Sequence, residues 1–374
     1  MKRKPAAFSQ LNVVAPETRD NPATFDVTNA EWDATIPNSL PWAIVQANAT
    51  AGEDDISIVA ALVPTLKATS TITITEAVQV HSNFAGQRVT ISGRGDANKS
   101  VLVIDLGPTV LPAPEFVTVE GDVGGGGLPP TARLVDIDFD SCSTIKDGGA
   151  ITVSAGILWV EKSKFNLNMT DVQFPGAIQG NGGAIAVKSG AILQIGGDVE
   201  FTNNNANRGG AIWAEGNVAV LNSGNHFSQN TAKYGGAIAS VGEGAVTVVG
   251  ATFNRNQAFI QGGAIWITSV SPAPSTHIIS QSSFAANSAK DVLGGGAGEG
   301  GAVYISAGTL AISLTDFANN FASLSGGGIS ASNAVVTIRG GSFNADSTTP
   351  VDKAGTSKGG AIYVGANGRA NASK

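Results

Sequence analysis

The chain has 374 residues, of which 42% are hydrophobic and only 14% are charged, so it can bury a large core and is not a disordered polymer. Its 48 glycines are far above the average share, which favours repeated tight turns over long helices. The net charge of −7, without clusters of Lys and Arg, excludes a nucleic-acid-binding surface.

Cys142 is the single cysteine, which excludes an intramolecular disulfide and a cysteine-rich zinc site. The start of the chain, MKRKPAAFSQLNVV, has a basic tip but lacks the apolar stretch of about 7 to 15 residues that a secretory signal contains. We expect no membrane-spanning helix, because no run approaches about 18 apolar residues.

Residues 1–55 are predicted to form an N-terminal extension and cap. Ser39 is suited to cap a helix that carries Pro41 in its first turn. One face of this helix is apolar and comprises Leu40, Ala43, Ile44 and Ala47. We expect the helix to cover the end of the solenoid that follows and so to hide its edge strand.

The next segment, residues 56–366, is predicted to be one elongated solenoid with a Pro/Gly-rich loop at 107–130. The run LVDIDFDS follows this loop, and strand alternation would place Val135, Ile137 and Phe139 inside. The outward residues would then be Asp136, Asp138 and Asp140, which are weak candidates for a calcium site. The alternative is a solvated acidic face, and a catalytic role is less favoured. We expect no other cofactor or metal.

Two short motifs recur from residue 134 to 364. A glycine pair followed by a strand occurs eight times, at Gly148, Gly182, Gly209, Gly235, Gly262, Gly300, Gly326 and Gly359. The spacing is 26 or 27 residues, lengthened three times by insertions. A Phe-x-x-Asn motif precedes most pairs, starting at Phe201, Phe227, Phe253, Phe284 and Phe317. Three copies at Phe139, Phe174 and Phe343 keep Phe and replace Asn. Such a fixed period is typical of a repeat architecture.

Each unit holds short β-prone runs bounded by Gly, Asn or Ser, which predicts an all-β, right-handed parallel β-helix. Stacked coils would place the phenylalanines in a core column. They would also place Asn204, Asn230, Asn256, Asn287 and Asn320 in a ladder whose amides satisfy one another. Cys142 falls in the Asn column and is predicted to be a buried structural thiol. The glycine pairs are predicted to form sharp corners that a Cβ would obstruct.

Aromatic residues occupy the third position after several glycine pairs, at Trp213, Trp266, Tyr304 and Tyr363. If the preceding residue points inward, these side chains form an outward stripe that could bind a glycan or a protein partner. The reversed register would make them core, and the sequence leaves both possibilities open.

The paired motifs, FxxN and GGA followed by Ile, Leu or Val, resemble the polymorphic outer membrane protein (Pmp-type) repeat of bacterial autotransporter adhesins and other surface proteins. The resemblance covers roughly residues 134–364. In addition, NSLPWAIVQANATAGEDDISI from Asn38 resembles the initial segment of many secreted right-handed β-helix proteins. The family resemblance implies an extracellular or cell-surface location and a role in adhesion.

Little else in the sequence indicates chemistry. His81, His226 and His277 share no position in the repeat, so they do not predict a metal or nucleophilic site. We therefore expect a non-enzymatic surface or assembly component whose β-helix contacts protein partners or copies of itself. These contacts would use its faces and an uncapped C-terminal end, before a polar tail at 367–374. An adhesin or glycan-binding module is the alternative, and a polysaccharide-cleaving enzyme is less favoured.

Overall fold

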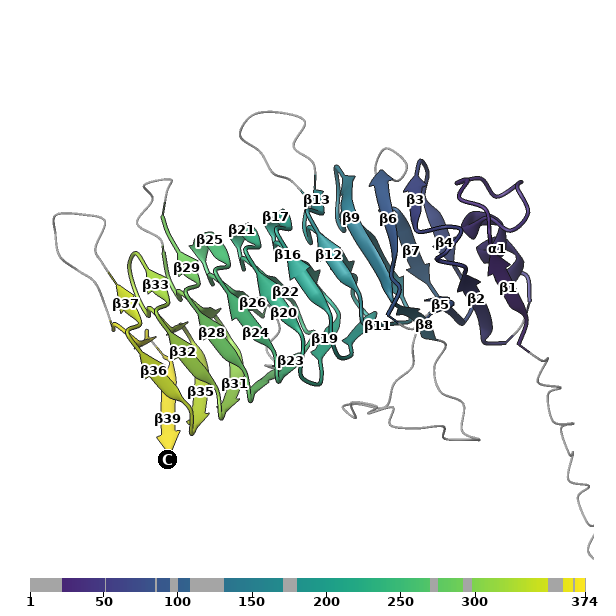
Figure 1. Cartoon of the computed structure of the whole chain (residues 1–374). Coiled ribbons are helices and arrows are strands. Elements are labelled where there is room, and N and C mark those ends of the chain that lie inside the picture. Colours follow the sequence, from purple (N-terminus) through teal and green to yellow (C-terminus); the bar gives the residue numbers. More distant parts are fainter. Residues whose placement is uncertain are drawn as a thin grey trace, which may run out of the picture.

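The computed structural model describes residues 22–50, 52–84, 86–94, 100–107, 131–170, 180–269, 275–291, 298–348, 359–365 and 367–373. Most of the predicted loop at 107–130 lies outside these residues, as does Phe174. Figure 1 shows a row of stacked coils with the single labelled helix at the N-terminal end of the row. Three long sheets run along the row, and every strand pairing between neighbouring coils is parallel.

Within the described residues, sheet 1 has twelve strands: β1 (Thr24–Val27), β2 (Asp54–Ile58), β5 (Val78–Ser82), β8 (Thr131–Val135), β11 (Ile157–Glu161), β15 (Ile192–Ile195), β19 (Asn217–Val220), β23 (Val246–Val249), β27 (Thr276–Ser280), β31 (Gly308–Ser313), β35 (Ala334–Arg339) and β39 (Arg369–Ser373). In the same part of the chain, sheet 2 has ten: β4 (Ile72–Ile74), β7 (Leu102–Asp105), β10 (Ile151–Ala155), β14 (Ile185–Val187), β18 (Ile212–Ala214), β22 (Ile238–Val241), β26 (Ile265–Thr268), β30 (Val303–Ile305), β34 (Ile329–Ala331) and β38 (Ile362–Val364).

Sheet 3 starts with β3 (Thr65–Ala68), β6 (Val89–Arg94) and β9 (Ile137–Thr144), and from there each strand is split in two at the Asn turn. The first halves are β12 (Lys164–Asn166), β16 (Glu200–Thr202), β20 (His226–Ser228), β24 (Thr252–Asn254), β28 (Ser283–Ala285), β32 (Asp316–Ala318) and β36 (Ser342–Asn344). The second halves are β13 (Met169–Thr170), β17 (Asn205–Arg208), β21 (Thr231–Tyr234), β25 (Gln257–Gln261), β29 (Ser288–Ala289), β33 (Phe321–Ala322) and β37 (Ser347–Thr348).

One coil passes from sheet 1 through sheet 3 to sheet 2 and back to sheet 1, as β15, β16, β17, β18 and β19 do in turn. Equivalent residues stack in register, so Ile185 pairs with Ile212 and Ile212 with Ile238. All three side chains are fully buried in one continuous core. This arrangement is a parallel β-helix and confirms the predicted all-β fold class.

The repeat motifs form two columns inside the coils. The phenylalanine rings stack with centroids 4.6–5.2 Å apart and planes within 9° of parallel. The stack runs through Phe139, Phe165, Phe201, Phe227, Phe253, Phe284, Phe317 and Phe343.

The copy assigned to Phe174 in the sequence is therefore wrong, because Phe165 and Asn168 occupy that coil's positions in the columns. The letters FNLN at Phe165 match the motif and could have been found.

The asparagines beside this stack form a hydrogen-bonded ladder from Asn168 to Asn320. Each Nδ2 donates to the Oδ1 of the next asparagine and to a phenylalanine carbonyl oxygen of the previous coil, at 2.9–3.0 Å. Each Oδ1 also accepts the backbone N–H of the previous asparagine. The buried amides are thus satisfied by their neighbours along the axis. At the ends of the ladder, the Cys142 N–H donates to Asn168, and Asp346 accepts from Asn320.

The glycine pairs form the corner between sheets 3 and 2. Gly209 has a φ of +62°, a left-handed conformation in which a side chain is disfavoured. At its neighbour Gly210, an added Cβ would lie 2.1 Å from the carbonyl oxygen of Gly236 in the next coil. Both positions of the pair therefore need glycine, one for its backbone dihedral and the other for its close contact.

The N-terminal helix, α1, spans Leu40–Ala47 and has the Ser39 Oγ as acceptor for the Trp42 N–H at 3.2 Å. Its buried Leu40, Ala43, Ile44 and Ala47 belong to the same core as the coils. Trp42 packs edge-on against Phe25 of β1. At the other end, β38 and β39 pair with β34 and β35, respectively. The expected open C-terminal end stays a prediction.

Candidate functional site on the outer faces of the β-helix

The predicted aromatic stripe points out of the coils from sheet 2. Trp213, Trp266 and Tyr304 are separate from the main core and form an outer aromatic cluster with Ala186 and Ala239. Large and small residues alternate here, since Trp213 pairs with an alanine on each side, which leaves room for the indole ring. The register question is thus decided in favour of outward side chains.

Outward orientation does not make these rings accessible, because only 5–9% of Trp213, Trp266 and Tyr304 is exposed. The Lys188 ammonium group lies 4.6 Å above the Trp213 ring. The ring centroids of Tyr234 and Trp266 are 4.9 Å apart, and the Trp266 Nε1–H donates to Gln261. Tyr363, in β38, is partly buried. Ligand binding by these four aromatic residues stays a prediction.

The acidic row differs from its predicted arrangement. Asp136 has a φ of +58° and lies in the corner between β8 and β9, so the run is not one alternating strand. Because the corner shifts the alternation, Val135 faces outward in β8, and Asp136 is 94% buried at the corner. The expected inward Val135 and the single outward row of three carboxylates are both wrong.

The other two aspartates are held by protein groups. Asp138 lies 3.6 Å from Arg88 and accepts the Lys164 N–H at 2.7 Å, and burial raises the pKa of its carboxyl group. Asp140 accepts hydrogen bonds from Asn166 and Ser141. Within the part of the chain that the structure describes, no three carboxylate, imidazole or thiol groups converge as metal ligands would.

The histidines and the cysteine lie in different surroundings. His81 pairs with Asp55 at 3.0 Å, and His226 is exposed on β20. His277 is buried and its Nδ1 accepts the Val246 N–H at 3.2 Å, and burial lowers its pKa to about 4. The buried Cys142 thiol has its pKa raised to about 12, mainly by burial, with the Asp140 charge adding to the effect. A buried thiol with a raised pKa is a poor nucleophile.

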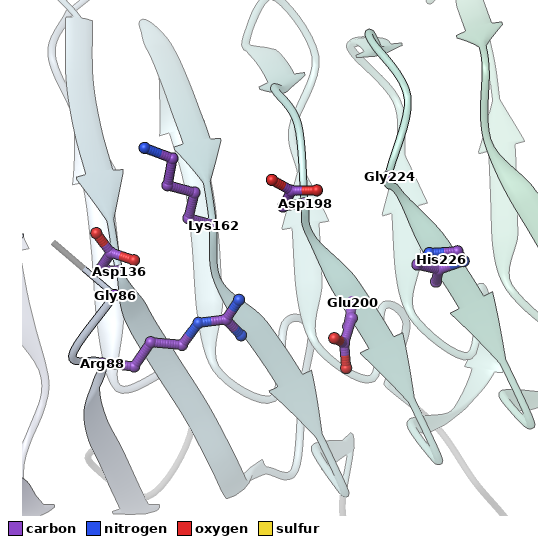
Figure 2. Close-up of a pocket in the computed structure, with 8 residues that line it drawn as sticks. All are labelled: Gly86, Arg88, Asp136, Lys162, Asp198, Glu200, Gly224 and His226. Carbon is purple, nitrogen blue, oxygen red and sulfur yellow. The ribbon is translucent and has the colours of Figure 1, made fainter.

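A charged groove lies on the outside of the β-helix, along the corner where the chain leaves sheet 1 for sheet 3. It has a volume of about 440 Å³ and is lined by Gly86, Arg88, Asp136, Lys162, Asp198, Glu200, Gly224 and His226. Figure 2 shows these residues on successive coils along one face. Sequence reasoning missed the groove because its residues share no motif, although Lys162, Asp198 and Gly224 have equivalent places just before strands of sheet 3.

The sequence comparisons agree with the motifs in the core. Residues 198–215 match the family model of the Chlamydia polymorphic membrane protein repeat. The chain carries a Pmp-type repeat. The matched segment contains Phe201, Asn204 and the pair Gly209–Gly210, which are the residues that make the core columns and the corner. The residues that define the Pmp-type motif are therefore the ones that build each coil of the β-helix. No curated protein matched the chain.

The family's description as membrane proteins raises the question of membrane contact. In the described residues, no helix has both the length and the apolar character needed to span a membrane.

Proposed function

We propose that the protein is a non-enzymatic cell-surface component whose β-helix makes protein–protein contacts through its lateral faces. This proposal rests on one observation: the recurring residues of the Pmp-type repeat point into the β-helix, and its variable residues point outward. The recurring Phe, Asn and Gly residues are taken up by the core and the corners.

The outward positions change from coil to coil instead. Along one outward column of sheet 3, successive coils present Asp138, Lys164, Glu200, His226 and Thr252. Solenoids commonly bind partners through extended faces of this kind, because each repeat adds one row of variable side chains. The surface location rests on the match to a membrane-protein repeat.

Three carboxylates on sheet 3 support the non-enzymatic assignment, because protein groups already bind them. Asp138, Asp140 and Glu200 are each engaged by a neighbouring protein group, at Arg88, Asn166 and Lys164. Incubation of the purified protein with a panel of polysaccharides should therefore release neither reducing ends nor unsaturated products. Release of either product would contradict this part of the proposal.

Surface exposure and lateral contact can be tested in the native cells. A photo-crosslinking residue is placed at exposed Arg255 or Asp316 on the lateral face, and at exposed Glu31 near the N-terminal cap as a control. We expect a reagent that cannot cross membranes to label the protein on intact cells. We also expect discrete crosslinked products from the two lateral positions but not from Glu31. Labelling that requires lysis, or no discrete product from either lateral position, would refute the proposal.

A further inference from the structure

The charged groove extends over several coils of the β-helix. Its lining residues come from five consecutive coils, which enter sheet 3 at β6, β9, β12, β16 and β20. Neighbouring strands lie about 4.8 Å apart, so four steps make the groove about 19 Å long. Its long direction follows the axis of the β-helix, as the successive residues in Figure 2 show. The shape suits an extended chain rather than a compact small molecule.

The backbone at the corner forms the groove. Asp136, Lys162 and Asp198 all have left-handed φ values, of +58°, +47° and +61°. In the next coil, Gly224 has a φ of +88°, and an added Cβ would lie 2.3 Å from the Asp198 Oδ1. Around Gly86, at the other end, none of the described atoms apart from those of its chain neighbours lies within 4 Å of where a Cβ would be. Because these two residues are glycines, they place no side chain across either end of the groove.

Two charged residues of the groove keep hydrogen-bonding capacity. Only 6% of Asp136 as a whole residue is exposed, and no hydrogen bond or ion pair reaches its side chain from the described residues. The buried Arg88 Nη1 is ion-paired with Asp138 at 3.6 Å, but this distance is too long for a hydrogen bond and no other described group supplies one. A buried donor without a hydrogen bond is costly, so a ligand acceptor at Arg88 would gain one.

The exposed groups add both donors and acceptors. Lys162, Asp198 and His226 are exposed, and none of them has a side-chain partner among the described residues. Glu200 is paired with Lys164 at 3.0 Å and keeps acceptor capacity. The groove therefore presents strong donors at Arg88 and Lys162, and strong acceptors at three carboxylates.

This mixture selects the chemistry of the ligand. A polyanion would meet Asp136, Asp198 and Glu200, and a polycation would meet Arg88 and Lys162. A peptide anchored by apolar side chains would find no apolar side chain among the described lining residues. A sugar hydroxyl both donates and accepts, so a neutral polyhydroxylated chain can satisfy both kinds of group.

An exposed aromatic side chain adds to this argument. Phe84 is 55% exposed and precedes the lining residue Gly86 by two positions in the chain, although it is not itself a lining residue. An aromatic face beside polar groups can pack on the apolar face of a sugar ring while the hydroxyls are hydrogen-bonded. We propose that the groove from Gly86 to His226 binds a neutral linear glycan along the axis of the β-helix. This inference stands on the groove and does not depend on the cell-surface role.

The test is titration calorimetry of the full chain against four probes: cellohexaose, chitohexaose, a heparin hexasaccharide and a hexalysine peptide. We expect at least one of the two neutral hexasaccharides to bind, and to bind more tightly than its own disaccharide. Binding of the heparin or hexalysine probe alone would overturn the proposal and would indicate an ionic site. Binding of none of the four probes would also overturn it.

Variants then locate the binding site. Lys162→Ala and Asp198→Ala remove exposed side chains, so both should fold, which circular dichroism can verify. Each should weaken binding of the neutral hexasaccharide at least tenfold. The matched controls are Arg339→Ala and Glu243→Gln, at exposed positions outside the groove, and they should change the affinity less than twofold. Equal affinities in the groove variants and the controls would place the binding elsewhere and refute the assignment.

Discussion

Replacing Asn230 by alanine is expected to open the middle of the asparagine ladder. The Asn230 Oδ1 accepts hydrogen bonds from the backbone N–H and the Nδ2 of Asn204, at 3.0 and 2.9 Å. The Asn230 Nδ2 donates to the Asn256 Oδ1 and the Phe201 carbonyl oxygen, each at 2.9 Å. All of these hydrogen bonds are buried, so water cannot replace the lost amide without rearrangement of the coils.

The size of the effect follows from the groups left without partners. Asn230→Ala orphans two N–H donors of Asn204, and each buried unsatisfied group costs about 1–3 kcal/mol. The expected loss is therefore about 2–6 kcal/mol for the coils on either side. Because a solenoid is stabilised largely by contacts between adjacent repeats, the damage should be local and should not spread evenly over the chain.

Amide hydrogen exchange followed by mass spectrometry resolves such a local change. Peptides containing residues 201–208 should exchange at least tenfold faster in Asn230→Ala, since about 1.4 kcal/mol corresponds to a factor of ten. The matched control is Asn254→Ala, which removes a half-buried amide whose side chain makes no hydrogen bond to the described residues. If both variants exchange at the same rate in these peptides, the ladder does not stabilise the coils as argued.

Three further predictions concern single positions. His277→Gln should remove part of the protein's sensitivity to acid. The folded pKa of His277, about 4, lies below its ordinary value of 6.5, so the unfolded chain binds an extra proton as the pH drops from 6.5 to 4. The free energy of unfolding, measured by urea titration, should therefore fall by about 3 kcal/mol over this range in the unsubstituted protein and by less in the variant. Gly236→Ala would place a Cβ 2.2 Å from the Gly263 carbonyl oxygen, and the urea midpoint should fall by the equivalent of about 1–3 kcal/mol or more. The Cys142 thiol should react with a chromogenic thiol reagent at pH 8 only after unfolding, and the absorbance of the released chromophore measures this reaction.

Each of these three has a result that would count against it. An unchanged pH dependence between pH 7 and 4 in His277→Gln would mean that other groups carry the acid sensitivity. Gly197→Ala, where the nearest atom to a new Cβ is 3.5 Å away, is the control for Gly236→Ala and should be tolerated, so equal effects would disprove the steric argument. Stoichiometric labelling of native Cys142 would show that the thiol is accessible.

The sequence analysis succeeded where the repeat itself carries the information. The Phe-x-x-Asn and glycine-pair spacing led to the parallel β-helix, because stacking in register requires the same residue type at the same place in every coil. The one misassigned copy, at Phe174, arose where insertion of extra residues separated Phe165 from its glycine pair at Gly182. The unit spacing was measured between glycine pairs, and the nearer phenylalanine was chosen.

The acidic run shows where strand alternation alone is insufficient. Alternation along LVDIDFDS predicted three outward carboxylates, but Asp136 takes a left-handed conformation at a corner and shifts the register by one. A two-residue period is valid only within one strand, and the sequence does not mark where this strand ends.

By itself, the sequence determined the coil: its period, its Phe and Asn columns and its glycine corners, all of which depend on residue types that recur at fixed offsets. Only the tertiary structure decided what lies on the outside. It placed Trp213 and Trp266 outward yet under neighbouring side chains, and it brought Arg88, Asp136, Lys162 and Asp198 into one groove. Residues that face solvent are not constrained by stacking, so they follow no period, and their neighbours are known only once the coils are in register.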